Sequence, residues 1–271
     1  MLLRLPAYFD VIPSLPLPLL IAVLVLYWGG LALVIHRWLV PWITGRDGIR
    51  IGRLEAEVPA QVGLAFGLLV SFITMSVWEQ HSRAADAART EAAAYREMVE
   101  SLEDSPPERS LAVRVAVHDS VAFILGTEWP KLAHLASPRM AAPPLRSLRS
   151  AIQSLPDGSQ HDELHDLYRQ AAAARETRLR IAADRPPPAR WGIVGVLAIL
   201  TLVGVGLIHA ECRRARRIAV GMVAVGIASC FVILFAYTRP YLGQFAVAPD
   251  ELRMLLSDMQ TAELPAAQTR R

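Results

Sequence analysis

The sequence predicts an all-α membrane protein with four transmembrane helices, arranged as two hairpins around one helical water-soluble insert. Hydrophobic residues make up 53% of the 271 residues, charged residues make up 20%, and the mean hydropathy is +0.32. This apolar content is above the usual range for a soluble domain. The apolar residues form four long stretches that are almost free of charge, whereas residues 79–190 are rich in Arg, Glu and Asp. Continuous apolar stretches of this length indicate helices surrounded by lipid.

The first predicted hairpin occupies residues 1–78, with spans at about 15–35 and 59–78. The first span has about 21 residues and therefore a helical length of about 31 Å, which is enough to cross a bilayer. The apolar run is too long for the core of a signal peptide and ends in His36-Arg37-Trp38 rather than at a small-residue cleavage site. We therefore interpret the first span as an uncleaved membrane anchor.

The second predicted hairpin occupies residues 191–238, with spans at about 191–209 and 218–237. The link between these spans, Ala-Glu-Cys-Arg-Arg-Ala-Arg-Arg, is long enough only for a tight turn between two helices. None of the four spans has a charged side chain in its interior. A helix satisfies its own backbone donors and acceptors, as the hydrocarbon region requires.

The insert, residues 79–190, is predicted to consist of helices interrupted by proline-rich breaks. The first helix continues from the second span and stops before Pro106-Pro107, the second covers about 108–135, and the third covers about 161–185. No alternating apolar pattern with a hairpin turn appears in this region. In the C-terminal segment, 239–271, we expect a short helix at 251–259 followed by a disordered polar tail.

The charge distribution predicts lipid as the main partner of the chain. The formal net charge is +3 and the pI is about 9.1, but the basic residues flank the spans, so no nucleic-acid partner is expected. Among the 28 basic residues only Lys131 is a lysine, a bias typical of GC-rich bacterial genomes, and we expect a multi-pass protein of the bacterial inner membrane. Arginines in loops 36–58 and 210–217 favour a cytoplasmic position for those loops, but arginines also flank the opposite ends of the spans. The side on which the insert lies therefore stays open.

No catalytic motif is present, so an enzyme is not expected, nor is any cofactor. Cys212 and Cys230 lack the spacing of a disulfide scaffold or of a metal site. His161 and His165 are four residues apart on a predicted helix, either as half of a metal site or, more commonly for such a pattern, as a solvated helix face. We predict no metal site.

The second span carries the most informative pattern. Small or weakly polar residues follow one face at spacings of four, four and three: Gly63, Gly67, Ser71 and Thr74. Small residues at such spacings allow helices to approach closely in lipid, so Gly63, Gly67 and Thr74 are candidate packing residues. Alternatively, the span lines a pore in an oligomer, with Ser71 facing water and an adjacent apolar constriction formed by Ala60, Leu64 and Leu68.

The helix that continues from the second span has a second notable face. Apolar or small residues recur at spacings of four and three, with one acid, Glu91, among them: Ala84, Ala88, Glu91, Tyr95, Met98 and Leu102. The acid is expected either to pair with an arginine of a neighbouring helix or to sense charge or bind a cation at the mouth of an ion pathway.

Three segments resemble the bestrophin-like family of bacterial membrane proteins. In the first, an apolar span runs through Trp78 into a helix that contains Glu91; the second is Glu128-Trp129-Pro130; in the third, Arg239-Pro240 ends the last span. Together with the four spans and the insert, the resemblance covers about residues 15–259.

This resemblance implies a distant likeness to bestrophins, which are pentameric anion channels with an apolar neck on the second helix and a helical cytosolic domain. Alignment of Trp78 and Gln80 carries the neck onto Ala60, Leu64 and Leu68. Ala60 is small where a bulky neck residue is expected, and the acidic cluster that binds calcium in animal channels has no counterpart here.

Two functional hypotheses follow. In the first, the chain forms a homo-oligomeric channel, a pentamer if it is bestrophin-like, which passes small inorganic anions such as chloride. In the second, it is a non-conducting, membrane-anchored helical module that binds a partner or senses envelope stress through its insert.

Overall fold

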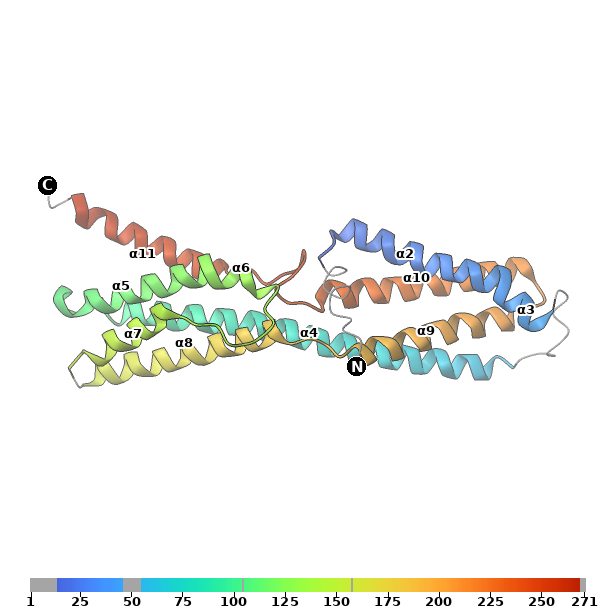
Figure 1. Ribbon diagram of the computed structural model, residues 1–271, viewed down its shortest axis with the longest axis horizontal. Helices are drawn as coiled ribbons and strands as arrows, with labels where there is room; N and C mark the ends of the chain where they lie inside the picture. Colours follow the sequence, from blue (N-terminus) through green and yellow to red (C-terminus); the bar gives the residue numbers. More distant parts are fainter. Residues whose placement is uncertain (1–13, 46–54, 104, 157, 269–271) are drawn as a thin grey trace. The chain divides into compact units, whose positions relative to one another are not determined.

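A computed structural model describes residues 14–268 except 46–54, 104 and 157. All regular structure in the described part is helical, as predicted, and no strand occurs there (Figure 1). The chain divides into two compact units. Unit 1 comprises Met1–Glu79, Arg185–Arg239 and Gly243–Phe245, and unit 2 comprises Gln80–Asp184, Pro240–Leu242 and Ala246–Arg271.

Unit 1 is a bundle of apolar helices. It contains α2 (Leu17–Val34), α3 (Val40–Thr44), the first part of α4 (Glu57–Glu100), α9 (Pro188–Ile208) and α10 (Arg213–Tyr237). The last of these helices packs against both α2 and α9 (Figure 1). Aromatic rings fill part of the core: Trp191 stacks on Phe235 with ring centroids 4.8 Å apart, and Trp28 lies 5.0 Å from Phe231.

Two helices extend beyond the predicted membrane spans. The first helix continues past residue 35 through a π-helical turn, η1 (Ile35–Leu39), into α3, and α10 begins at Arg213 rather than at 218. The π turn ends two residues before Pro41, which has no N–H and whose ring would clash with a carbonyl in a regular α-helix. The arginines at the start of α10 are good helix formers, so hydrophobicity marks the apolar part of this helix and not its beginning.

Five helices are long and apolar enough to cross a membrane, judged by length and composition alone. They are Leu17–Thr44, Glu57–Glu100, Ser110–Leu132, Ala189–Ile208 and Arg213–Tyr237. Four of them overlap the predicted spans to within two residues at each end that falls short, and the fifth lies in the predicted insert. The mean hydropathy of the most apolar window is 1.3 in this fifth helix and between 1.8 and 2.7 in the others.

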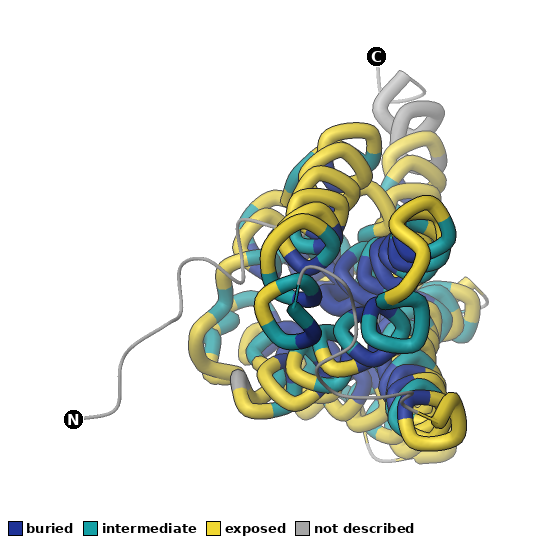
Figure 2. The backbone as a smooth tube through the Cα atoms, turned by 90° about the vertical axis from the view of Figure 1, so that its right-hand side faces the viewer, coloured by how far each residue is buried: buried dark blue, intermediate teal, exposed yellow. Residues whose placement is uncertain are grey.

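Unit 2 has a separate hydrophobic core. It consists of the remainder of α4, α5 (Pro107–Phe123), η2 (Ile124–Glu128), α6 (Trp129–Leu132), α7 (Pro143–Gln153), α8 (Ser159–Ala183) and α11 (Asp250–Gln268). The core includes Tyr95 and Met98 of the predicted packed face of α4. In Figure 2, the helices are buried on the side that faces their neighbours and exposed on the other side.

The sequence analysis missed α7 and placed the end of α11 too early. In α7, Leu145, Leu148 and Ile152 form one buried face, but the helix is short and follows a proline-rich break. The last helix continues past Met259 to Gln268, where a disordered tail was expected. This segment contains Pro265 but also the good helix formers Ala, Glu, Leu and Gln.

Candidate functional site

The first part of α4 has one buried face and one exposed face in unit 1. Its buried face, formed by Phe66, Val70, Ile73 and Val77, belongs to the core of the bundle. The predicted neck residues lie on the opposite side of the helix, given 3.6 residues per turn. Leu64 and Leu68 are 65% and 53% exposed, and Ala60 and Ser71 are also exposed. These four side chains therefore share a face that the described part of unit 1 leaves exposed.

The candidate packing residues of α4 differ from one another in their surroundings. A Cβ atom built on Gly63 would lie 3.7 Å from the Thr201 side chain, whereas one built on Gly67 would meet nothing within 4 Å. The hydroxyl of Thr74 donates a hydrogen bond to the Val70 carbonyl, and that of Ser71 donates one to the Gly67 carbonyl. Among the described helices of unit 1, none packs against the Gly67–Ser71 part of this stripe.

Two glycines of α9 that were not among the predicted packing residues lie very close to neighbouring helices. A Cβ atom built on Gly204 would lie 2.8 Å from the Pro59 Cβ atom at the start of α4. One built on Gly206 would lie 2.8 Å from the Cγ2 atom of Val40, a fully buried residue. The approach of α9 to α4 and α3 therefore depends on the absence of side chains at these two positions.

A buried ion-pair network lies in unit 2 and is centred on Arg178 of α8. Its Nε atom donates a 2.7 Å hydrogen bond to Glu91 Oε2, and its Nη2 atom donates 3.0 Å hydrogen bonds to Glu91 Oε1 and Glu128 Oε2. All three side chains are 0% exposed. The Arg175 guanidinium also binds Glu128 and donates a hydrogen bond to the Met140 carbonyl. The network thus joins α4, η2 and α8 through two acids and two bases.

Aromatic rings enclose this network. The Arg178 Cζ atom lies 5.1 Å from the centroid of the Trp129 ring, a cation–π contact. The Trp129 ring in turn meets the Tyr241 ring edge to face, with centroids 5.8 Å apart. Because rings and apolar side chains exclude water here, each charge depends on its partners rather than on solvent.

The environment shifts the pKa values of several of these groups. Burial raises the pKa of Glu91, and the Arg178 guanidinium acts in the opposite direction. Burial alone would lower the pKa of Arg178, but the carboxylates of Glu91 and Glu128 outweigh it and raise the pKa, so the guanidinium stays charged. Burial also raises the pKa of Tyr95 and of Tyr241, so both phenols stay neutral.

The structure brings together some of the predicted motif residues and leaves others apart. Glu91, Glu128 and Trp129 meet at Arg178 in unit 2. Pro130 occupies the first turn of α6 directly after Trp129. In unit 1, the Trp78 ring lies 5.6 Å from the Tyr237 ring, and Arg239 is buried. Pro240 follows Arg239 in the chain and belongs to unit 2.

Arg175 and Arg178, which complete the network, were not predicted from the sequence. Of the two interpretations of Glu91, the structure shows the first, pairing with an arginine of a neighbouring helix. A signal for that arginine exists in the sequence: Arg178 continues the face of Ala171 and Ala174, both of which are buried. A charged residue in line with small buried residues indicates a buried ion pair.

His161 and His165 stack on one another with ring centroids 6.4 Å apart. In the part of the chain that the structure describes, no group of three or more His, Cys, Asp or Glu residues is placed to hold a metal ion.

The Tyr241 hydroxyl donates a 3.2 Å hydrogen bond to the Ala84 carbonyl inside unit 2. We expect Tyr241→Phe to lower the free energy of unfolding by about 1 kcal/mol, because the substitution removes a buried hydrogen bond and keeps the ring. Urea unfolding followed by tryptophan fluorescence measures the change. The half-buried Tyr168, for whose hydroxyl the structure shows no hydrogen bond, provides the control Tyr168→Phe, which should leave the midpoint unchanged. Equal midpoints for both variants would contradict the prediction.

These features define a multi-pass helical membrane protein with a second unit built around buried ion pairs. The Bestrophin-like domain matches residues 46–252, and the chain belongs to the bestrophin-like family. This confirms the resemblance seen in the sequence. No curated protein sequence matches the chain significantly.

Solved structures show the same fold. A variant of a bacterial bestrophin homolog from Klebsiella pneumoniae is 12% identical, and the alignment covers 89% of this chain and 98% of that chain with a TM-score of 0.67. Another variant of this Klebsiella pneumoniae homolog is 14% identical, with the same coverage and TM-score. A third structure, described as a membrane protein, is 15% identical, with coverages of 90% and 97% and a TM-score of 0.65. At such low identity the likeness extends to the fold alone.

Proposed function

We propose that copies of this chain assemble into a closed ring, a pentamer as in bestrophins, in which the first part of α4 lines a pore for small inorganic anions. One observation carries the proposal: Ala60, Leu64, Leu68 and Ser71 share an exposed face of α4, opposite the face that packs into unit 1. In a ring these side chains would meet those of neighbouring copies around the axis. The anion preference rests on the family resemblance. We assign no catalytic role.

The apolar face of α4 suits a constriction that controls ion flow through wetting. Leu64 and Leu68 lie one helical turn apart, between the polar residues Gln61 and Ser71. Two rings of leucine in a narrow pore would expel water, and ions would cross only when the pore widens or wets.

A substitution at the proposed constriction tests the proposal. We expect Leu68→Ser to raise chloride flux from reconstituted liposomes several-fold, because a hydroxyl lowers the cost of wetting the constriction. Liposome efflux measured with a chloride electrode gives the readout. The matched control is Leu200→Ser on α9, where an exposed leucine is changed outside the proposed pore. A protein that is monomeric in native mass spectrometry and shows no flux in any form would refute the channel function.

We also propose that four of the five apolar helices cross the bacterial inner membrane and that Ser110–Leu132 does not. This helix includes η2 and α6, and its residue Glu128 is fully buried in unit 2 among ion-pair partners. Val117 and Val121 belong to the core of unit 2 rather than to a lipid-facing surface. The spans would then form two hairpins, as the sequence predicts.

The alternative, a non-conducting module that binds a partner through its insert, is supported by the separate core of unit 2. Deletion of residues 106–160 is a poor test, because it removes Glu128 and the core residues of α5 and α7. Exposed charges of unit 2 are better targets. Loss of a captured partner on substitution of Arg146 and Arg149, with chloride flux absent throughout, would favour the module.

A further inference from the structure

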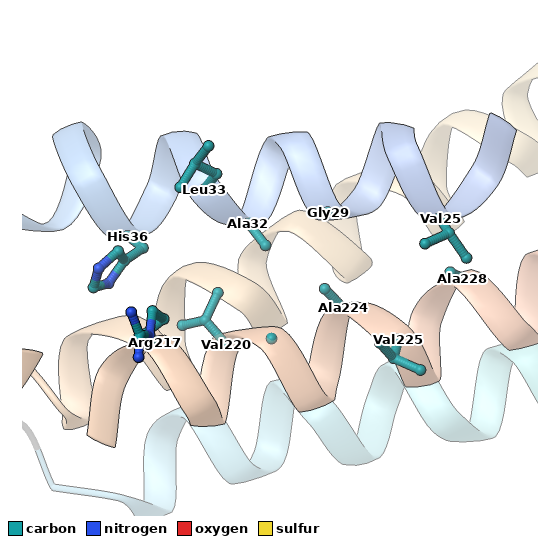
Figure 3. Close-up of a pocket in the computed structure, with 11 residues that line it drawn as sticks. Val25, Gly29, Ala32, Leu33, His36, Arg217, Val220, Ala224, Val225 and Ala228 are labelled. Carbon is teal, nitrogen blue, oxygen red and sulfur yellow. The ribbon is translucent and has the colours of Figure 1, made fainter. Parts of the chain in front are cut away.

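An apolar groove lies between α2 and α10 in unit 1 (Figure 3). Its volume is about 260 Å³, and small residues from both helices form its floor: Gly29 and Ala32 of α2, and Gly221, Ala224 and Ala228 of α10. A Cβ atom built on Gly29 or on Gly221 would meet nothing within 4 Å. The exposed side chains of Val25, Leu33 and Val225 form its rim. The groove thus opens on the outer surface of two membrane-length helices.

One end of the groove is cationic. Figure 3 shows His36 of η1 and Arg217 of α10 at this end, with Val25 and Ala228 at the other. Behind His36 lies Arg216, which is only 4% exposed; its Nε atom donates a 3.2 Å hydrogen bond to His36 Nδ1, and its Nη1 atom donates one to the Ala210 carbonyl. Among the described residues, no carboxylate pairs with Arg216 or Arg217. A buried guanidinium that none of the described carboxylates neutralises favours an anion at this end.

The dimensions of the groove fit a single hydrocarbon chain. Val25 and His36 are eleven residues apart, which corresponds to about 16 Å along the helix axis. Half of the hydrocarbon core of a bilayer is about 15 Å thick, so a chain from one leaflet would extend over the whole groove. An α-helix of a second protein copy is about 10 Å wide with its side chains, too wide for a hollow of this volume.

We propose that this groove binds an anionic phospholipid, with one acyl chain along the small residues of α2 and α10 and the phosphate group at Arg217 and His36. Basic pockets between membrane helices bind lipid head groups of this charge. The Arg217 guanidinium is exposed and can reach the phosphate, while Arg216 adds positive charge from behind the His36 ring. The inference requires that these helices lie in a membrane but does not depend on ion conduction.

Native mass spectrometry of the detergent-purified full chain tests this site. The protein is incubated with equal amounts of phosphatidylglycerol and phosphatidylcholine that carry identical acyl chains. We expect retention of phosphatidylglycerol over phosphatidylcholine. Arg217→Ala should weaken phosphatidylglycerol binding about fivefold, the effect of one basic residue near an anionic lipid surface, without affecting phosphatidylcholine. Arg149→Ala, an exposed charge of unit 2, serves as the charge control.

A second pair of variants tests the groove itself. Gly221→Leu should fill the groove and lower the retention of phosphatidylglycerol, whereas Gly226→Leu should not, because Gly226 lies on the same helix in open space and does not line the groove. Equal retention of both lipids by the unmodified chain would overturn the proposal. It would also be overturned if millimolar inorganic phosphate displaced the lipid completely, or if Gly221→Leu changed the oligomeric state and not the lipid count. If Gly221→Leu does not fold, the retention of phosphatidylglycerol by Arg217→Ala tests the proposal on its own.

Discussion

Replacement of Arg178 by alanine is expected to lower the free energy of unfolding of unit 2 by about 3–5 kcal/mol, because it leaves two buried carboxylates without their shared partner. Glu91 would lose both of the hydrogen bonds that the structure shows for its carboxylate, and Glu128 would keep only Arg175. Hydrogen exchange measured by mass spectrometry reports such a change locally. We expect amide protection in the second half of α4 and in α8 to fall by two to four orders of magnitude.

Two further variants of α8 make this result specific. Arg180→Ala, two residues further along the helix, removes an arginine whose partner Glu176 is also exposed, and protection should not change measurably. Arg178→Lys keeps the charge but not the planar guanidinium that binds both carboxylates. We therefore expect a loss of amide protection between those of Arg180→Ala and Arg178→Ala. Unchanged protection in Arg178→Ala would show that the network contributes nothing to the stability of unit 2.

The second large effect is expected in unit 1, where Gly204→Val should force α9 away from α4. The first atom of any side chain at this position would meet the Pro59 Cβ atom at 2.8 Å, and the Pro59 Cα atom lies behind it at 3.5 Å. The pyrrolidine ring and the backbone cannot move aside as a flexible side chain can. Overpacking of this kind costs about 1–3 kcal/mol. We expect a lower midpoint of thermal aggregation in detergent and a reduced yield of folded protein.

Position 195 of the same helix provides the control for this experiment. A Cβ atom built on Gly195 would meet nothing within 4 Å, so Gly195→Val adds the same β-branched side chain without the clash. Its midpoint should match that of the unmodified protein. If the midpoint of thermal aggregation fell by a similar amount in both variants, the cause would be the low helix propensity of valine rather than the contact with Pro59.

The features that the sequence predicts well are those that depend on composition over many residues. The four apolar stretches are visible because a helix in lipid needs no polar face, and all four overlap membrane-length helices of the structure. The packed face of α4 is visible because its spacing repeats over several turns, and Ala84, Tyr95 and Met98 are all fully buried. Such patterns average over local exceptions.

The features that escaped prediction depend on contacts between distant segments. Arg178 lies far from Glu91 in the sequence, and its position in line with Ala171 and Ala174 indicates burial but not which acid it pairs with. Likewise, several glycines of α9 look alike, but only the structure shows which of them meet Pro59 and Val40. The short α7 has too few turns for its apolar spacing to stand out.

The π-helical turn η2 has a consequence for comparing this chain with its relatives. This turn ends at Glu128, just before Pro130, and a π turn holds one residue more than an α-helical turn. Loss of one residue between Ile124 and Glu128 would restore a regular helix and rotate every earlier side chain by about 100° relative to Trp129. Deletions in family alignments should therefore fall within this turn, and a relative with such a deletion must turn a different face of its α5 toward the core of unit 2, while the acid at the end of the turn keeps its place beside the tryptophan.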